Sequence, residues 1–524
     1  MIIYICTLPQ PIVKFRQNQP FKLRLFGGLK KTNMNKKIST IVSFALLASL
    51  VIFSGCGCRP TSTTSYEVRL EVWGLFDDSD VISKAISEYQ KRNPRVKEIV
   101  YKKHTVDSYE NDLMDALATG NGPDIFLVHN TWLPKHQDKL AAAPVDNLSA
   151  NQTPILIPKQ VQDQFADVVS ADFVSDGKVF ALPLSADSLA LYYNKDLLNQ
   201  AGIASPPATW PDFDAAVKKI THVDSLGNIN PSGAAMGMSS DASSNTGGKI
   251  NRATDILTLL MLQSGAEMFN PQTKMATFAD FTKATYGGQI SPGESALAYY
   301  TKFSNPANAE YSWNSQQHNS KDSFIEGRTA MMLNYSWLIP QIQTKAPKLN
   351  LGIAKVPQNK DKNGNGLDID FANYWGYGVS ANKVQNQESV ATATQDKQIY
   401  ATNDQRVAEA WKFIRFLTMP QSFSADLPNQ PQTAESANFD PAAEYLKNQN
   451  KPAARRDLIE KQKSDILLSS FAQGNLIAKS WPQPDNLAVE NIFDQMIDNV
   501  VLKGGKMHDA IIQAQNSVNV LLRK

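Results

Sequence analysis

The sequence predicts an α/β protein with more than one domain. Its 524 residues are 42% hydrophobic and 19% charged, which is an ordinary globular composition at a length that usually holds two or more domains. Between residues 66 and 128, segments with the period-2 alternation of a strand alternate with segments that carry apolar residues on one helical face. This alternation favours right-handed βαβ crossovers and a largely parallel sheet.

The individual elements can be placed in order. Val68, Leu70 and Val72 alternate with polar residues and predict the first strand. A helix follows, with Asp78 as one possible cap and Asn93-Pro94 as its end. The next predicted elements are a strand at 96–101, a helix at 108–118 and a strand at 124–128. Ligands of such sheets bind beyond the carboxyl ends of the strands, which directs attention to the loops at 73–78 and 129–132, although either could be a simple connection.

The basic residues of the chain are unevenly distributed. Residues 1–55 contain eight Lys or Arg and no Asp or Glu, which leaves 44 basic and 50 acidic residues in the remainder. An acidic body offers no electrostatic footprint for nucleic acid. From Met34, two lysines precede an apolar run at 38–53 and then Ser54-Gly55-Cys56, the order of a secretory signal. We expect residues 1–33 to precede the true start, 34–55 to be a signal peptide and 56–65 a flexible tether.

Three cysteines are present, namely Cys6, Cys56 and Cys58. The chain after Cys58 can therefore form neither an internal disulfide nor a thiolate metal site. No His-x-x-x-His or Cys/His cluster supports a metal. We expect neither a metal nor another cofactor.

Several motifs occur in order along the chain. Residues 177–183 read GKVFALP, residues 191–198 read LYYNKDLL and residues 206–211 read PPATWP; GPDI at 122–125, FIEGRTAMM at 324–332 and AWKFIRFLT at 410–418 accompany them. Together they resemble the extracellular solute-binding proteins that include the maltodextrin-binding family. The segment 381–406 is longer and more polar than the corresponding turn in that family. Phe53-Ser54-Gly55-Cys56 resembles the lipobox of bacterial lipoproteins, with Phe53 where that motif prefers Leu; a plain signal anchor is the alternative.

The resemblance implies a two-lobed periplasmic-binding-protein-like fold with three inter-lobe crossings, placed near 186–190, 330–335 and 376–380. Lobe 1 would comprise 66–187 plus 334–375, and lobe 2 would comprise 188–333 plus 376–524. The implied protein is a monomer, anchored at the cell surface or in the periplasm through a lipid on Cys56. It would close around a small solute and deliver it to the permease subunits of an ABC importer, without being an enzyme.

A sugar is the expected solute, because a pyranose has apolar faces that suit aromatic rings and a polar rim that suits hydrogen-bonding groups. The resemblance and the strand ends together nominate Trp73, Asp77, Asp78, His129, Asn130, Trp132, Asp187, Trp337, Tyr374, Trp375 and Trp481. Core packing is the alternative for each Trp, a helix cap for Asp78 and a solvated loop for His129. Trp210 and Trp411 belong to helix motifs and are assigned to packing.

Two other functions stay open. A secreted carbohydrate-active hydrolase needs two carboxyl groups across one cleft, and no catalytic motif surrounds such a pair; the Gly-x-Ser-x-Gly pattern is absent. A ligand-sensing receptor component could use the same fold. Polyols, glycerol phosphate and polyamines are alternative solutes.

Overall fold

The first sheet is built around the strand predicted at the start of the body. β1 (Val68–Gly74) pairs in parallel with β2 (Val96–Lys103) on one side and β3 (Ile125–His129) on the other. The sheet continues antiparallel through β14 (Trp375–Ser380), β4 (Leu140–Ala141) and β7 (Ala181–Leu182). The computed structural model describes residues 66–144, 154–240, 247–281, 291–360, 364, 366–381, 383 and 401–523. The predicted segments 1–33, 34–55 and 56–65, with Cys56, lie outside these residues.

The two helices that connect β1, β2 and β3 also agree with the prediction. α2 (Ser79–Arg92) buries Ile82, Ala85 and Tyr89, and α3 (Val106–Ala118) follows β2. β1, β2 and β3 with these helices thus form the predicted βαβ units, whereas the strands added from later in the chain run antiparallel.

A second, smaller sheet is antiparallel throughout. β8 (Ala190–Asn194) lies between β11 (Met331–Asn334) and β12 (Leu351–Lys355). The parallel pairing predicted from residues 66–128 therefore does not extend to this half of the chain. The βαβ pattern that supported it occurs only between residues 66 and 128, and no such alternation governs residues 190–355.

Buried apolar residues form two separate groups, here named the first core and the second core. The first core includes residues of α4 (Leu133–His136), α5 (Pro158–Gln164), α6 (Asp167–Phe173), α13 (Asn403–Thr418), α15 (Pro441–Gln449) and α16 (Arg456–Gln462). The second core includes residues of α7 (Lys195–Gln200), α8 (Trp210–Ile220), α9 (Ala253–Gln263), α10 (Pro292–Thr301), α11 (Ser320–Ile325), α12 (Ile339–Lys345), α18 (Asn486–Val501) and α19 (Met507–Leu522).

Shorter elements complete the described chain. α14 (Ala434–Asn438) buries none of its residues, and α17 (Ser469–Asn475) contributes to both cores. The 3-10 helices are η1 (Gln137–Lys139), η2 (Lys302–Ser304), η3 (Ser336–Leu338) and η4 (Gln421–Ser424). Two-residue strands pair as β5 (Val174–Ser175) with β6 (Lys178–Val179), β9 (Phe269–Asn270) with β10 (Met275–Ala276), and β13 (Asp370–Phe371) with β15 (Ala478–Lys479).

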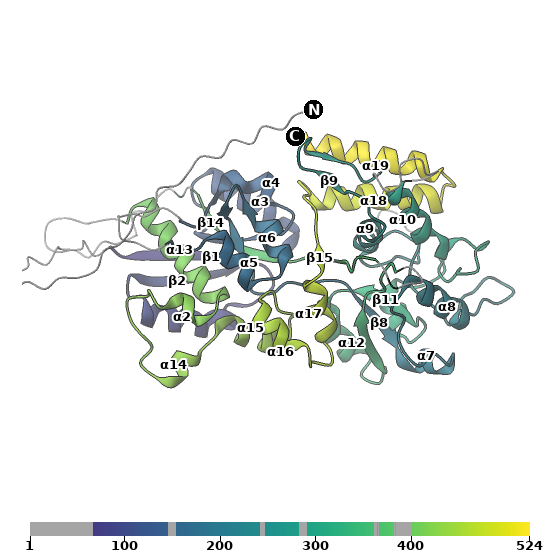
Figure 1. The fold of residues 1–524 in the computed structure, drawn as a ribbon, viewed down its shortest axis with the longest axis horizontal. Coiled ribbons are helices and arrows are strands. Elements are labelled where there is room, and N and C mark those ends of the chain that lie inside the picture. The colour runs from purple at the N-terminus through teal and green to yellow at the C-terminus, as the bar shows by residue number, and fades with distance from the viewer. Residues whose placement is uncertain are drawn as a thin grey trace, which may run out of the picture. The chain divides into compact units, whose positions relative to one another are not determined.

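The chain passes between the two cores three times. The first crossing lies between Ala186 and Leu189, the second between Phe371 and Ala372, and the third within 459–481. Figure 1 shows α17 and β15 of the third crossing between the elements of the two cores. The number of crossings and the first position, 186–190, agree with the prediction.

The other two predicted crossings are wrong. The segment 330–335 contains β11, which pairs with β8 inside the second core, and the segment 376–380 belongs to β14, which lies beside β3 in the first sheet. The predicted lobe boundaries change accordingly. Within 334–375, buried residues up to Phe371 belong to the second core, and within 376–524, buried residues from Tyr377 to Ile459 belong to the first core. Motif matching located these segments but did not reveal which strand each one pairs with.

The two tryptophans assigned to packing are buried. Trp411 is fully covered in α13 and its Nε1 donates to the carbonyl of Ala141 at 2.9 Å. Trp210 begins α8, where the Thr209 hydroxyl caps the helix by accepting from the Asp212 amide. Within the described chain, no helix combines the length and apolar character that a membrane span requires.

The second and third crossings are packed tightly at Gly474, which gives a stability prediction. A Cβ at this position would clash with Asp370 Oδ2 and Ser188 Oγ. We expect Gly474→Ala to lower the free energy of unfolding by about 1–3 kcal/mol, the usual cost of overpacking, as measured by denaturant unfolding. Gln473→Ala on the same helix is the matched control and should change it by less than about 0.5 kcal/mol. Equal stabilities of the two variants would contradict this account of the packing.

Candidate functional site

A cavity of about 580 Å³ lies between the two cores. Its walls draw on the loop after β1, on β3 and β14 of the first sheet, on the residue before α9 and on η3 beside the second core, and on the end of α15 with the residues that follow it. The cavity is rich in aromatic side chains, namely Phe76, Tyr335, Trp337, Tyr374, Trp375, Tyr377 and Tyr445. Its volume and its mixture of aromatic and polar groups are typical of a site for a small molecule.

The structure brings together five of the eleven residues nominated from the sequence. The nominated residues that line the cavity are Asp77, Asp187, Trp337, Tyr374 and Trp375. Trp375 and Tyr374 stand at the start of β14 and just before it, and Trp337 lies on η3, with 48% of its surface exposed. The cavity therefore has a tryptophan on each side, one from each core.

Three nominated residues lie elsewhere. Trp73 is buried, stacks on His104 at 4.0 Å and donates from Nε1 to Glu71. Trp481 is buried against Phe278 and Phe493 in the second core. Asp78 is exposed, forms an ion pair with Lys103 at 2.9 Å and makes no side-chain cap on α2. Side chains alternate between the faces of a strand, so a position near a strand end did not decide which tryptophan faces the cavity.

The remaining three nominated residues form a layer behind Trp375. His129 and Trp132 pack edge-to-face on the Trp375 ring, each with its ring centroid 5.0 Å away. Asn130 is buried, and its Oδ1 accepts from the Tyr374 backbone amide at 3.3 Å. These residues support the cavity wall without lining it, and His129 is buried rather than solvated.

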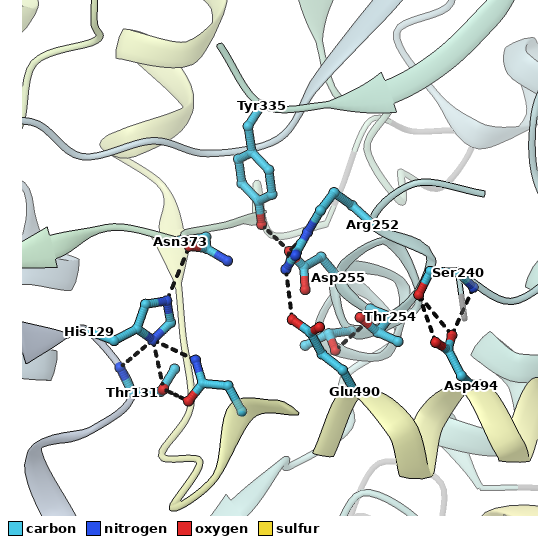
Figure 2. A network of polar contacts seen from close by, with 12 residues as sticks. His129, Thr131, Ser240, Arg252, Thr254, Asp255, Tyr335, Asn373, Glu490 and Asp494 are labelled. Carbon is cyan, nitrogen blue, oxygen red and sulfur yellow. Dashed lines mark hydrogen bonds and ion pairs between the residues drawn. The ribbon is translucent and has the colours of Figure 1, made fainter. Parts of the chain in front are cut away.

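His129 links Asn373, which lines the cavity, to Asn486 of the second core (Figure 2). Its Nε2 faces Asn373 Oδ1 at 3.1 Å and must carry the proton, so Nδ1 accepts from Asn486 Nδ2 at 2.7 Å. Thr131 lies 2.9 Å from Nδ1. Burial lowers the pKa of His129 to about 4, which keeps the ring neutral at pH 7. Asn373 lines the cavity, and its side-chain oxygen is engaged by His129. Its amide nitrogen is therefore the group that remains to donate to a ligand.

Asn486 joins the two cores through side-chain hydrogen bonds. It is the first residue of α18, a helix of the second core, and its Oδ1 accepts from Trp132 Nε1 at 2.9 Å and from the Thr131 hydroxyl at 2.8 Å. The wall behind Trp375 therefore contains contributions from both halves of the chain.

Asp187 lies in the first crossing and accepts hydrogen bonds from Ser336. The Ser336 hydroxyl donates to Oδ2 at 2.7 Å and its backbone amide donates to the same oxygen at 3.0 Å. Removal from water raises the pKa of the Asp187 carboxyl to about 7, despite the lowering effect of these hydrogen bonds. The group is thus poised to change charge near neutral pH.

Two basic side chains that the sequence analysis missed also line the cavity. Lys451 forms an ion pair with Asp77 at 3.2 Å and contacts the Tyr445 hydroxyl at 2.6 Å. Arg252 pairs with Asp255 at 2.5 Å and with Glu490 at 3.1 Å. Neither lies in a motif that the family resemblance identified, and no periodic pattern marks them in the sequence.

Figure 2 shows the Arg252 cluster with Tyr335, whose hydroxyl donates to Asp255 at 2.6 Å. Arg252 adopts a left-handed backbone conformation, with φ 64°, at the start of α9. Its Nη1 has no hydrogen-bond partner among the described residues. In the described part of the chain, no group of three or more His, Cys, Asp or Glu side chains is arranged to hold a metal ion.

Comparisons with known proteins match this chain to bacterial solute-binding proteins. A family model described as bacterial extracellular solute-binding protein matches residues 84–444. An arabinooligosaccharide-binding protein of Bacillus subtilis is 23% identical over 254 residues, 45% of this chain and 56% of that protein. The chain spans about half the length of the curated relatives it matches.

Solved structures of the same α/β, two-lobed fold cover most of the chain. The cyclic alpha-maltosyl-1,6-maltose binding protein of Arthrobacter globiformis matches with a TM-score of 0.61 and 19% identity, over 87% of this chain and 99% of that one. The sugar-binding protein MalE of Xanthomonas citri matches with a TM-score of 0.61 and 19% identity, over 87% of this chain and 98% of that one.

The buried His129 predicts a pH dependence of stability. Its folded-state pKa of about 4 lies below the ordinary 6.5, so the stability contributed by the neutral ring is present above pH 6.5 and is lost as the pH falls toward 4. Between pH 7 and pH 4 we expect the free energy of unfolding of the unchanged protein to fall by up to about 3 kcal/mol more than that of His129→Gln. Denaturant unfolding measures both. His222→Gln, at an exposed histidine, is the control. If His129→Gln retains the full pH dependence of the unchanged protein, this explanation is wrong.

Proposed function

Because the chain belongs to the family of bacterial extracellular solute-binding proteins, we propose that it captures a carbohydrate, specifically an oligosaccharide, in the cavity between its two cores. The observation that carries this proposal is that Trp337 and Trp375 line one cavity from opposite cores. Flat rings from two sides suit the apolar faces of a sugar, and neighbouring polar groups suit its hydroxyls.

Three polar groups are suited to the rim of the sugar. Asn373 offers its amide nitrogen, Arg252 offers Nη1, and Asp187 offers a carboxyl acceptor. Asn373 and Arg252 are held in place by hydrogen bonds on their other atoms, which lowers the entropy lost when a ligand binds. Each such bond to a ligand hydroxyl contributes on the order of 1 kcal/mol.

The ligands of the similar proteins support the carbohydrate assignment. They include an arabinooligosaccharide, a cyclic maltosyl-maltose and sugars of a maltodextrin type. All of these proteins are described as binding proteins, which supports binding without turnover for this chain. Incubation with labelled oligosaccharides tests this directly, because hydrolysis products would favour a carbohydrate-active enzyme instead.

Capture would proceed by closure of the two lobes around the sugar. Three adjacent crossings can bend together while resisting twist, so each core would move as a rigid body. The ligand would shift the equilibrium toward the closed form, which the permease subunits of an ABC importer would recognise. In this scheme the protein acts as a monomer.

The site of action would be the outer surface of the membrane. Residues 34–56 combine a positive segment, an apolar run and a lipobox-like sequence ending at Cys56. A lipid on Cys56, followed by the Gly-, Pro-, Ser- and Thr-rich segment 57–65, would tether the binding domain close to the permease.

Removal of one cavity tryptophan tests carbohydrate capture. We expect Trp337→Ala to weaken oligosaccharide binding about 10- to 100-fold, because the ring face that covers the sugar is lost. Calorimetric titration against a panel of oligosaccharides measures this. Phe281→Ala is the matched control, because Phe281 is similarly exposed, 46% against 48%, and lies outside the cavity. Unchanged affinity in Trp337→Ala would remove this ring from the site.

The lipid anchor has its own test. We expect Cys56→Ser to move the mature protein from the membrane fraction to the soluble fraction, because a serine cannot be diacylated on sulfur. Cell fractionation followed by mass spectrometry of the mature N-terminus measures both outcomes. Cys58→Ser is the control and should remain in the membrane fraction. Retention of Cys56→Ser in the membrane would favour an uncleaved signal anchor.

A further inference from the structure

One charged side chain that lines the cavity has no ion-pair partner among the described residues. The two cations that line it are engaged, Lys451 with Asp77 and Arg252 with both Asp255 and Glu490. Asp187 also lines the cavity, and within the described residues it forms no ion pair. Its carboxyl is held by hydrogen bonds from the Ser336 hydroxyl and from the backbone amides of Ser336 and Ser188.

The groups around Asp187 supply little positive charge. The Asp370 carboxyl is buried in the second crossing, where burial and, more weakly, the charge of Asp187 raise its pKa. Asp172 is a further buried carboxyl, behind Tyr374. Lys451 is the basic residue that acts on Asp187, and its effect is the smallest of those on that carboxyl. The tyrosine hydroxyls of Tyr192 and Tyr335 also face its charge.

The aromatic walls are compatible with a cation. A positive group over the face of a tryptophan or tyrosine ring is attracted by the ring quadrupole, and the attraction is stronger where water is excluded. Trp337 and Trp375 line the cavity together with Asp187. An anionic ligand would meet only cations whose charge is already paired with carboxylates, Lys451 with Asp77 and Arg252 with Asp255 and Glu490. The Nη1 of Arg252, which has no partner among the described residues, would act on it as a hydrogen-bond donor.

Building on the carbohydrate-binding function proposed above, we propose that the preferred ligand is an amino sugar, whose protonated amine forms an ion pair with Asp187. Uronic acids and sugar phosphates are disfavoured by the same arrangement. The amine is the counter-ion of Asp187 that the protein itself does not supply. The sugar ring packs on the faces of the two tryptophans.

The ion pair has a measurable consequence for protons. At pH 6 the Asp187 carboxyl of the free protein is largely protonated, because its pKa is raised to about 7. A bound ammonium favours the ionised carboxylate, so binding releases up to one proton per ligand. A neutral sugar at the same site leaves the carboxyl protonated, so its binding releases no proton from Asp187.

Calorimetric titration of the mature protein tests the proposal with sugar pairs that differ only in amine for hydroxyl at carbon 2. The pairs are glucosamine and glucose, galactosamine and galactose, and the β-1,4-linked trimers of glucosamine and of glucose. We expect the amine member of at least one pair to bind ten-fold or more tightly. Titrations at pH 6 in buffers of different ionisation enthalpy should show proton release with the amine member only.

Variants separate the carboxyl from the general charge of the protein. Asp187→Asn should remove both the amine preference and the proton release, with folding checked by its melting temperature. Asp78→Asn makes the same substitution at an exposed carboxylate outside the cavity and should behave like the unchanged protein. The comparison of sugar pairs in the unchanged protein does not depend on either variant.

Each outcome has a distinct meaning. Equal or tighter binding of every neutral member, without proton release, overturns the amino-sugar inference and leaves carbohydrate capture standing. Failure of all these sugars and of a neutral oligosaccharide panel to bind overturns the proposed function itself. Amine preference that survives in Asp187→Asn assigns the cation to another group and also overturns the inference.

Discussion

The pairing of three short segments at the crossings is the constraint on which the rest of the structure depends. β13 and β15 pair in parallel, and Ser188 bridges to Ala372, so the three crossings are hydrogen-bonded to one another. Because each segment contributes only a few residues, the connection is narrow, and each core packs on its own. The cavity exists because two independently packed bodies are held side by side by this junction.

The cavity itself is a composite of distant sequence. Its aromatic rings come from residues as far apart as Phe76 and Tyr445, and its wall behind Trp375 is completed by Asn486. Hydrogen bonds behind the surface fix the groups that face inward, as His129 does for Asn373. A site built in this way gains selectivity from supporting residues that never touch the ligand.

Much of the first half of the fold could be predicted from the sequence, because β1, α2, β2, α3 and β3 are local and strongly periodic. The later strands could not, because β14 takes its place in the first sheet through pairing with β3, far away in the chain. In the candidate site, Trp375 and Trp337 were identified by residue type and position near motifs, but the same reasoning also chose the buried Trp73 and Trp481. Arg252 and Lys451 were missed because their place in the cavity arises only from tertiary packing.

The left-handed backbone at Arg252 sets local strain against the ion pairs that this side chain forms. A residue with a Cβ in this region carries a strain of about 1 kcal/mol or more, and glycine would relieve it. Glycine would also remove the guanidinium and leave Asp255 and Glu490 close together without a counter-ion. Removing one partner of a largely buried ion pair costs more than this strain, so the two ion pairs keep a residue with a Cβ in an unfavourable backbone conformation. Thermal robustness and an intact cavity therefore both select arginine at this single residue.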